Sequence, residues 1–234
     1  MKTLGIVGGI GPESTIEYYR QLMAGYRKRT SDDTYPRLLI DSIDVNRLLF
    51  LAAQPERQAL VDYLLESVSR LARAGVDLAL LAANTPHLVF GQLALRSPIP
   101  LISIVEATCE FAKAHRLNKL GLWGTRFTMQ AGFYQEAGRM QDIAIVLPDL
   151  DEQSYIHERY VNELVKGVFL PETRDGMLAI AGAMKERDHI EGVILGGTEL
   201  PLLLRDEREI GISFLDTTRI HVNAALDRIL TTSD

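Results

Sequence analysis

The sequence predicts an α/β protein of two pseudo-symmetric lobes, each a roughly four-stranded parallel sheet flanked by helices, with an active-site cleft between the lobes. Two internal repeats predict this duplication. The segment Leu4-Gly5-Ile6-Val7-Gly8 is similar to Leu120-Gly121-Leu122-Trp123-Gly124, and Leu80-Leu81-Ala82-Ala83-Asn84-Thr85 is similar to Ile194-Leu195-Gly196-Gly197-Thr198-Glu199. Both pairs are separated by nearly the same length of chain, as two copies of one unit require.

Short, continuous apolar runs predict four strands in each half, because strands that are covered on both faces lack polar alternation. The expected strands are 4–7, 38–40, 78–81 and 101–104, followed by 120–123, 143–147, 193–195 and 212–215.

Amphipathic segments between these strands predict helices, most clearly over 55–74, with Gly75 as its stop. The last helix is expected over 217–230. We therefore expect a first α/β lobe over residues 1–115, a second over 116–215, and a C-terminal helix within 216–234 that packs back across the lobes.

Composition restricts the class of this 234-residue chain. A hydrophobic fraction of 47% allows a sizeable core. The single cysteine and the absence of a signal-peptide pattern predict a reducing, cytoplasmic setting. No apolar run reaches the roughly 18 residues of a membrane span, so we expect a soluble protein without a membrane partner. The formal net charge of −6 argues against a nucleic-acid partner, because phosphate binding needs a basic face.

The loop that follows the first predicted strand, Gly8-Gly9-Ile10-Gly11-Pro12, has two interpretations. Its exposed backbone N–H groups, that of Ile10 among them, can bind a carboxylate or phosphate at a helix N-terminus. It can also be a simple strand-to-helix turn. Dinucleotide binding is disfavoured, because the loop lacks the G-x-G-x-x-G spacing and a well-placed acidic partner.

Polar side chains also follow the strands predicted at 78–81 and 193–195. They lie beyond the carboxyl ends of these strands, where ligands of parallel sheets bind. Small residues there let a ligand approach the backbone, while Asn84, Thr85, Thr198 and Glu199 supply donors and acceptors. Thr125 follows the strand that ends at Gly124 and either donates to a carboxylate or caps the next helix.

Three motifs in this order resemble the aspartate/glutamate racemases of the Asp/Glu/hydantoin racemase superfamily, over nearly the whole chain. The motifs are the opening Met1 to Thr15, Asn84-Thr85-Pro86-His87, and Leu195-Gly196-Gly197-Thr198-Glu199-Leu200-Pro201. The resemblance implies two pseudo-symmetric α/β lobes with the active site between them, commonly in a homodimer. Apolar helix faces such as that of 16–23 leave room for a dimer interface.

The resemblance also implies a reaction without a cofactor, in which a cysteine on each side of the substrate Cα acts in turn as base and acid. The matching positions are Ala83 and Gly197, so both thiols are absent. Cys109 is expected to be buried in an apolar helix around 105–111. The five histidines show no i, i+4 pairing, so we predict no metal site.

The remaining candidates for proton transfer are Thr85, Thr198 and Glu199. A hydroxyl without an adjacent base abstracts protons poorly, and Glu199 belongs to the shared family pattern, which favours an ammonium-binding or structural role. His87 either tethers its loop or takes part in catalysis.

The resemblance further assigns Arg47 and Lys166 to the grip on the substrate's side-chain carboxylate, with Arg126 as a weaker candidate. Each can instead be a solvated surface cation. Three hypotheses follow. The first is a racemase-family protein for aspartate, glutamate or a similar small carboxylate, with altered or lost two-base proton transfer. The second is a lyase or decarboxylase on this scaffold. The third is a carboxylate-binding protein without catalysis, which includes a deliberately inactivated variant.

Overall fold

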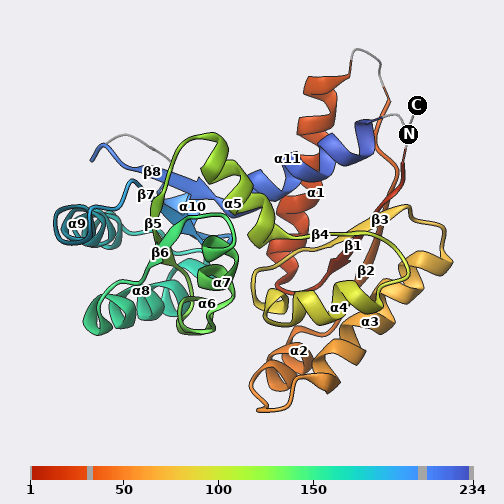
Figure 1. The fold of residues 1–234 in the computed structure, drawn as a ribbon, viewed down its shortest axis with the longest axis horizontal. Helices are drawn as coiled ribbons and strands as arrows, with labels where there is room; N and C mark the ends of the chain where they lie inside the picture. The colour runs from red at the N-terminus through yellow and green to blue at the C-terminus, as the bar shows by residue number, and fades with distance from the viewer. Residues whose placement is uncertain (1, 31–33, 205–209, 232–234) are drawn as a thin grey trace. The chain divides into compact units, whose positions relative to one another are not determined.

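The computed structural model describes residues 2–30, 34–204 and 210–231 (Figure 1). The chain forms two compact units, one of Met1–Ala107 with Thr218–Asp234 and one of Thr108–Thr217. Each unit contains a four-stranded parallel sheet, in the order β2-β1-β3-β4 in the first and β6-β5-β7-β8 in the second. Equivalent strands have the same order in both sheets, which confirms the predicted fold class and its duplication.

All eight predicted strands form, and helices connect them. The elements in order are β1 (Leu4–Gly8), α1 (Pro12–Arg29), β2 (Leu38–Ser42), α2 (Val45–Ala52), α3 (Gln58–Arg73), β3 (Leu78–Leu81), the 3₁₀ helix η1 (Thr85–Val89), α4 (Phe90–Arg96), β4 (Leu101–Ile102), α5 (Ile104–Ala114), β5 (Lys119–Trp123), α6 (Arg126–Gln130), α7 (Phe133–Arg139), β6 (Ala144–Val146), α8 (Leu150–Asn162), the 3₁₀ helix η2 (Leu164–Lys166), α9 (Pro171–Asp188), β7 (Gly192–Leu195), α10 (Leu200–Leu203), β8 (Ser213–Asp216) and α11 (Thr217–Leu230).

In the first unit, helices α1 and α11 cover one face of the sheet. Tyr18 and Leu22 of α1 are fully buried in one cluster with strand residues and with Leu226 of α11. The two helices lie side by side (Figure 1), and Gly25 permits their close approach, since a Cβ atom there would lie 2.5 Å from Leu226 Cδ1. The C-terminal helix thus belongs to the core of the first sheet.

The predicted helix over 55–74 is wrong at its start, because α3 begins at Gln58. The guanidinium of Arg57 donates to the backbone carbonyls of Ala52 and Gln54, at and just beyond the end of α2. These bonds satisfy carbonyls that have no partner within the preceding helix. The chain therefore turns between two helices here, whereas the C-terminal stop at Gly75 is confirmed by its left-handed φ of 85°.

The second unit is centred on Trp123, which is fully buried at the end of β5. Its indole N–H donates to the Met184 sulfur at 3.5 Å, and its ring lies 6.2 Å from that of Phe214. The large apolar side chains of β5, α9 and β8 thus form one core beneath the carboxyl ends of the strands.

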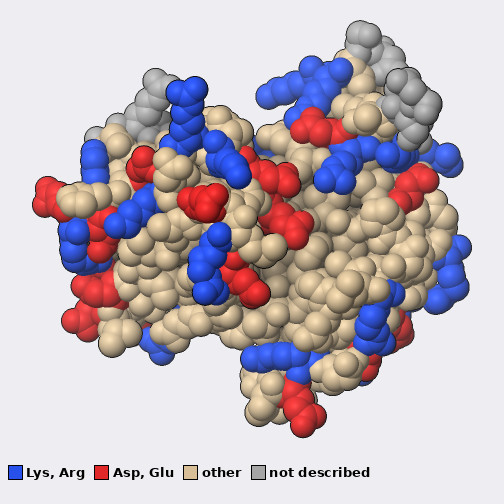
Figure 2. Space-filling model, viewed as in Figure 1, with Lys and Arg blue, Asp and Glu red and all other residues tan. Residues whose placement is uncertain are grey.

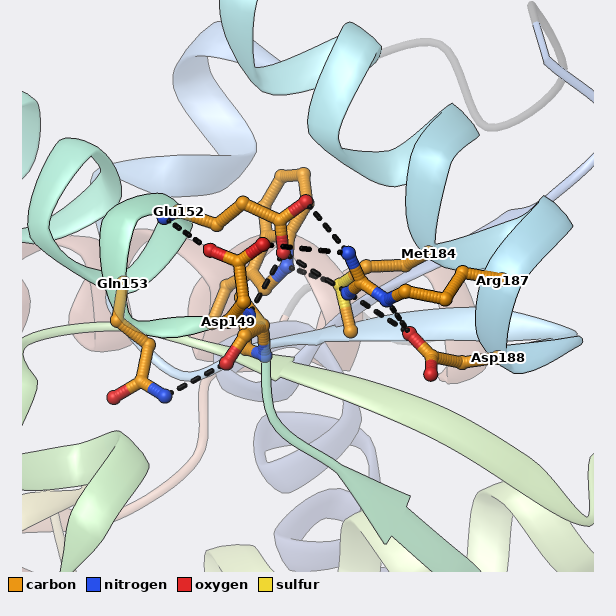
Figure 3. A network of polar contacts seen from close by, with 8 residues as sticks. Asp149, Glu152, Gln153, Met184, Arg187 and Asp188 are labelled. Carbon is orange, nitrogen blue, oxygen red and sulfur yellow. Dashed lines mark hydrogen bonds and ion pairs between the residues drawn. The ribbon is translucent and has the colours of Figure 1, made fainter.

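A network of polar contacts joins the start of α8 to the end of α9 (Figure 3). Asp149 and Glu152 form a capping box at the first turn of α8. Arg187 donates to both carboxylate oxygens of Glu152, at 3.1 and 3.0 Å, and pairs with Asp188 at 2.9 Å. These carboxylates raise the pKa of Arg187 above its usual value.

We expect Arg187→Ala to lower the free energy of unfolding of the second unit by about 1 kcal/mol, since the arginine is 42% exposed and partly screened by solvent. The loss should shrink in 1 M salt. Urea unfolding at both salt concentrations measures it. Arg139→Ala is the control, because this exposed arginine has no ion pair within the described residues. Equal stability of the two variants at low salt would contradict the expectation.

Candidate functional site

In the first unit, the loops after β1 and β3 are neighbours. These strands pair in parallel with Val7 opposite Leu81, so their carboxyl ends lie at the same sheet edge. The Ser14 hydroxyl at the start of α1 donates to the carbonyl of Ala82 at 2.7 Å, and this bond is buried. The glycine loop and the loop that carries Asn84 and Thr85 are therefore tied together.

Close packing and backbone conformation require a glycine at position 9, in the loop after β1. Gly9 adopts a φ of +77°, and a Cβ atom there would lie 2.4 Å from the Ile43 carbonyl oxygen. Its N–H donates to Thr15 Oγ1 at 2.9 Å. Ile10 buries its side chain, and its N–H has no hydrogen-bond partner among the residues that the structure describes. The loop is thus a tight turn that leaves the Ile10 N–H as a backbone donor beside the N-terminus of α1.

His87 tethers the loop after β3. Its ring accepts a hydrogen bond from the Ile104 N–H at Nε2, at 3.1 Å, which leaves Nδ1 to donate to the Ala83 carbonyl at 3.0 Å. Burial, and to a lesser extent the nearby His221, lower the pKa of His87 to about 3. Both ring nitrogens of the neutral imidazole are occupied by backbone groups, which supports the tethering interpretation.

The other two residues of this loop differ in exposure. Asn84 is buried, with 6% of its surface exposed, and Thr85 is half-buried at the first position of η1.

Arg47 lies on the first turn of α2, next to the glycine loop. Asp44 caps this helix by accepting from the backbone N–H of Asn46 and of Arg47. The Arg47 guanidinium lies 4.8 Å from the centre of the Tyr63 ring, in cation–π contact. It is exposed and forms no ion pair within the described ranges. The Tyr63 ring thus orients the guanidinium, and no carboxylate among the described residues pairs with it.

In the second unit, Thr125 caps α6. Its Oγ1 accepts from the Thr128 N–H at 3.2 Å, so the capping interpretation holds in this structure. Arg126 is exposed, and its backbone N–H donates to His157 Nδ1 at 3.2 Å. Lys166 is exposed at the end of η2, and nothing in the described contacts brings its side chain to the strand-end loops.

The loop after β7 contains a polar cluster that the sequence did not predict. Tyr160 of α8 donates its hydroxyl proton to Glu199 Oε2. Thr198 Oγ1 donates to the same oxygen at 2.8 Å. Gly197 lies against the Tyr160 ring. The structure thus brings Gly197, Thr198 and Glu199 together with a tyrosine 39 residues before Glu199 in sequence.

Other kinds of site have less support. Cys109 is buried in α5, as predicted. Over the ranges that the structure describes, no group of three His, Cys, Asp or Glu side chains is placed to hold a metal ion. Within those ranges, no helix is both long and apolar enough to cross a membrane. Figure 2 shows basic and acidic side chains interspersed on the face in view.

Two copies of a four-stranded parallel α/β unit, each with small and polar residues after its central strands, match the architecture of amino-acid racemase-like proteins. Within this class, the chain belongs to the Asp/Glu/Hydantoin racemase family, whose model matches residues 7–225.

Individual relatives agree with this assignment. The chain is 24% identical over 221 residues to the broad specificity amino-acid racemase RacX of Bacillus subtilis, covering 92% of each chain. It superimposes on a putative Asp/Glu racemase from Yersinia pestis with a TM-score of 0.92 and 29% identity, covering 99% of this chain and 100% of that one. For an aspartate racemase homologue from Pyrococcus horikoshii OT3, the TM-score is 0.87, the identity 31%, and the coverage 98% and 99%.

Proposed function

We propose that this protein binds aspartate, glutamate or a similar small carboxylate at its strand-end loops. We further propose that its two-base proton transfer is altered or lost, because Ala83 and Gly197 stand at the positions that the family resemblance assigns to cysteines. The observation that carries the ligand class is Arg47, a guanidinium that Tyr63 orients and that has no carboxylate partner among the described residues. A guanidinium binds a carboxylate through two parallel hydrogen bonds.

Two further donors and one acceptor support binding of an amino acid. The Ile10 N–H lies beside the N-terminus of an 18-residue helix, where the helix dipole favours an anion. Thr85 follows a central strand of the first unit, and Glu199, which accepts from the Thr198 hydroxyl, offers a carboxylate to an ammonium group. Lys166 is assigned to the ligand only through the family resemblance, and Thr125 only through its place after the repeated strand that ends at Gly124. The Asp/Glu and broad-specificity racemases among the relatives support the same class of ligand.

We also propose that the protein is a homodimer in the cytoplasm. Ile16 and Tyr19 on α1 support a dimer, because they expose 43% and 48% of their surface.

Two measurements with L- and D-aspartate and L- and D-glutamate test the proposed function. Thermal unfolding reports binding, because a ligand that prefers the folded state raises the midpoint. Proton NMR in D₂O reports whether the Cα proton exchanges. Binding with exchange indicates proton abstraction, binding alone indicates a carboxylate-binding protein, and a product of changed mass indicates a lyase. No stabilisation by any of these ligands would contradict the proposal.

Arg47→Ala is expected to weaken binding of aspartate or glutamate by about 10- to 100-fold, since a hydrogen bond between charged groups contributes about 1.5–3 kcal/mol. Isothermal titration calorimetry measures the loss. Arg20→Ala serves as the control, because it removes an exposed arginine of the same unit from α1. Unchanged affinity in Arg47→Ala would show that this arginine is a surface cation only.

A further inference from the structure

Tyr160 occupies the space beside Gly197. A Cβ atom built on Gly197 would lie 2.5 Å from Tyr160 Cε2, 2.6 Å from its hydroxyl oxygen and 2.7 Å from Cζ. The phenol end of Tyr160 thus lies closer than van der Waals contact to the Cβ atom of any side chain at position 197. A thiol at position 197 and the Tyr160 hydroxyl would therefore occupy the same space.

The hydroxyl in this place is connected to a carboxylate. Tyr160 donates its proton to Glu199 Oε2, and the Thr198 hydroxyl donates to the same oxygen. One carboxyl oxygen of Glu199 thus accepts from two hydroxyls, which its two lone pairs allow. Burial and the nearby Glu199 raise the pKa of Tyr160 well above its usual value, so its hydroxyl keeps its proton.

We infer that the Tyr160 hydroxyl, held by Glu199 and Thr198, contacts the ligand's Cα–H bond and exchanges its proton in place of a thiol at position 197. This inference rests on the proposed binding of an acidic amino acid. The inference requires that the Tyr160 hydroxyl be accessible to a ligand bound at the loop after β7. Tyr160 keeps 8% of its surface exposed, and Thr198 and Glu199 are half-buried, so the cluster reaches the edge of the unit.

The proton transfer balances with the groups present. The Cα–H bond breaks, and its electron pair stays on the ligand, delocalised into the α-carboxylate. The proton passes to the Tyr160 oxygen while the proton of that hydroxyl passes to Glu199 Oε2. In D₂O, solvent deuterium replaces the protons on Tyr160 and Glu199, and the reverse transfers then restore the ligand with deuterium on Cα. Since one group removes and returns the proton on the same side, the amino acid exchanges in D₂O while it keeps its configuration.

Tyr160→Phe tests this inference, because it keeps the ring against Gly197 and removes the hydroxyl alone. We expect wild-type protein in D₂O to exchange the Cα proton of the bound enantiomer with retained configuration. In Tyr160→Phe the exchange rate should fall by about 10²–10⁴-fold, the usual contribution of a general acid–base group. Tyr155→Phe is the matched control, since it removes a half-buried hydroxyl from the same helix on the side of Gly176.

Ligand-induced thermal stabilisation, recorded on the same samples, separates the possible failures. Stabilisation in all three proteins, with exchange lost only in Tyr160→Phe, supports the inference. Equal exchange in Tyr160→Phe and wild type overturns it, as does a wild type that is stabilised by ligand but shows no exchange, and in both cases the proposed binding stands. Absence of both stabilisation and exchange in wild type overturns the proposed function as well.

Discussion

Lowering the pH from 7 to 4 is expected to reduce the free energy of unfolding of the first unit steeply, by up to about 1.4 kcal/mol per pH unit for each of two buried histidines. His87 and His221 both lie in the core, with rings 6.2 Å apart. Burial lowers the pKa of His221 to about 4, and burial with the charge of His221 lowers that of His87 to about 3.

The hydrogen bonds of His221 fix its neutral form. Its Nε2–H donates to the Ile102 carbonyl at 2.9 Å, and its Nδ1 accepts from the Tyr18 hydroxyl at 2.8 Å. In the unfolded chain, both histidines bind a proton near pH 6.5. Between that pH and the folded pKa values the unfolded state holds more protons, so stability is present above pH 6.5 and is lost as the pH falls.

Urea unfolding at pH 7, 6, 5 and 4 measures this loss. His221→Gln should lower stability at pH 7 but give a shallower decline between pH 6 and 4, because one buried titrating group is gone. His115→Gln is the control, since His115 is exposed and stacks on Phe111. A wild-type stability that does not change between pH 6.5 and 4 would contradict the burial of two neutral histidines.

Introducing cysteines at positions 83 and 197, which the family resemblance assigns to the catalytic thiols, is expected to give no racemase activity unless Tyr160 is also replaced. The Cβ of Gly197→Cys would lie within 2.7 Å of three Tyr160 atoms. Forcing extra atoms into a packed site costs about 1–3 kcal/mol or more. The double variant Ala83→Cys with Gly197→Cys should therefore be destabilised and should not racemise aspartate or glutamate.

Adding Tyr160→Ala to this pair removes the clash and gives the new thiol its space. We expect this triple variant to gain racemase activity that the double variant lacks, because each acid–base group contributes about 10²–10⁴ in rate, while removal of the buried Tyr160 ring lowers the stability of the second unit. Chiral chromatography measures the product. Gly182→Cys is the steric control, since a Cβ there meets no atom within 4 Å. A double variant as stable as wild type would show that Tyr160 moves freely.

Periodicity predicted the fold well because the strands are buried on both faces and the duplication repeats them. Helix α11 begins and ends where the pattern placed it, at Thr217 and Leu230. The predicted start of α3 at residue 55 was too early, since the chain stays outside the helix until Gln58 and the Arg57 side chain binds backbone carbonyls of Ala52 and Gln54 instead. The spacing of apolar residues does not predict such a hydrogen bond.

The strand-end loops were also predictable, because small and polar residues follow the repeated strands. Tyr160 was not, since it reads as an ordinary residue of an amphipathic helix. Its role depends on contact with a glycine and a carboxylate of a distant loop. Only the fold brings them together, and the single signal in the sequence was a glycine at the position that the family resemblance assigns to a cysteine.

The assignment of α11 to the first unit has a consequence for synthesis. The second unit, Thr108–Thr217, is an insertion between two parts of the first, and α11 contributes Val222, Ala225 and Leu226 to the core of the first sheet. On the ribosome, chains emerge from the N-terminus at about 5–20 residues per second. The first sheet must therefore wait, with one face covered by α1 alone, until the whole second unit has been made, and the part of the protein that is translated first is the last to be completed.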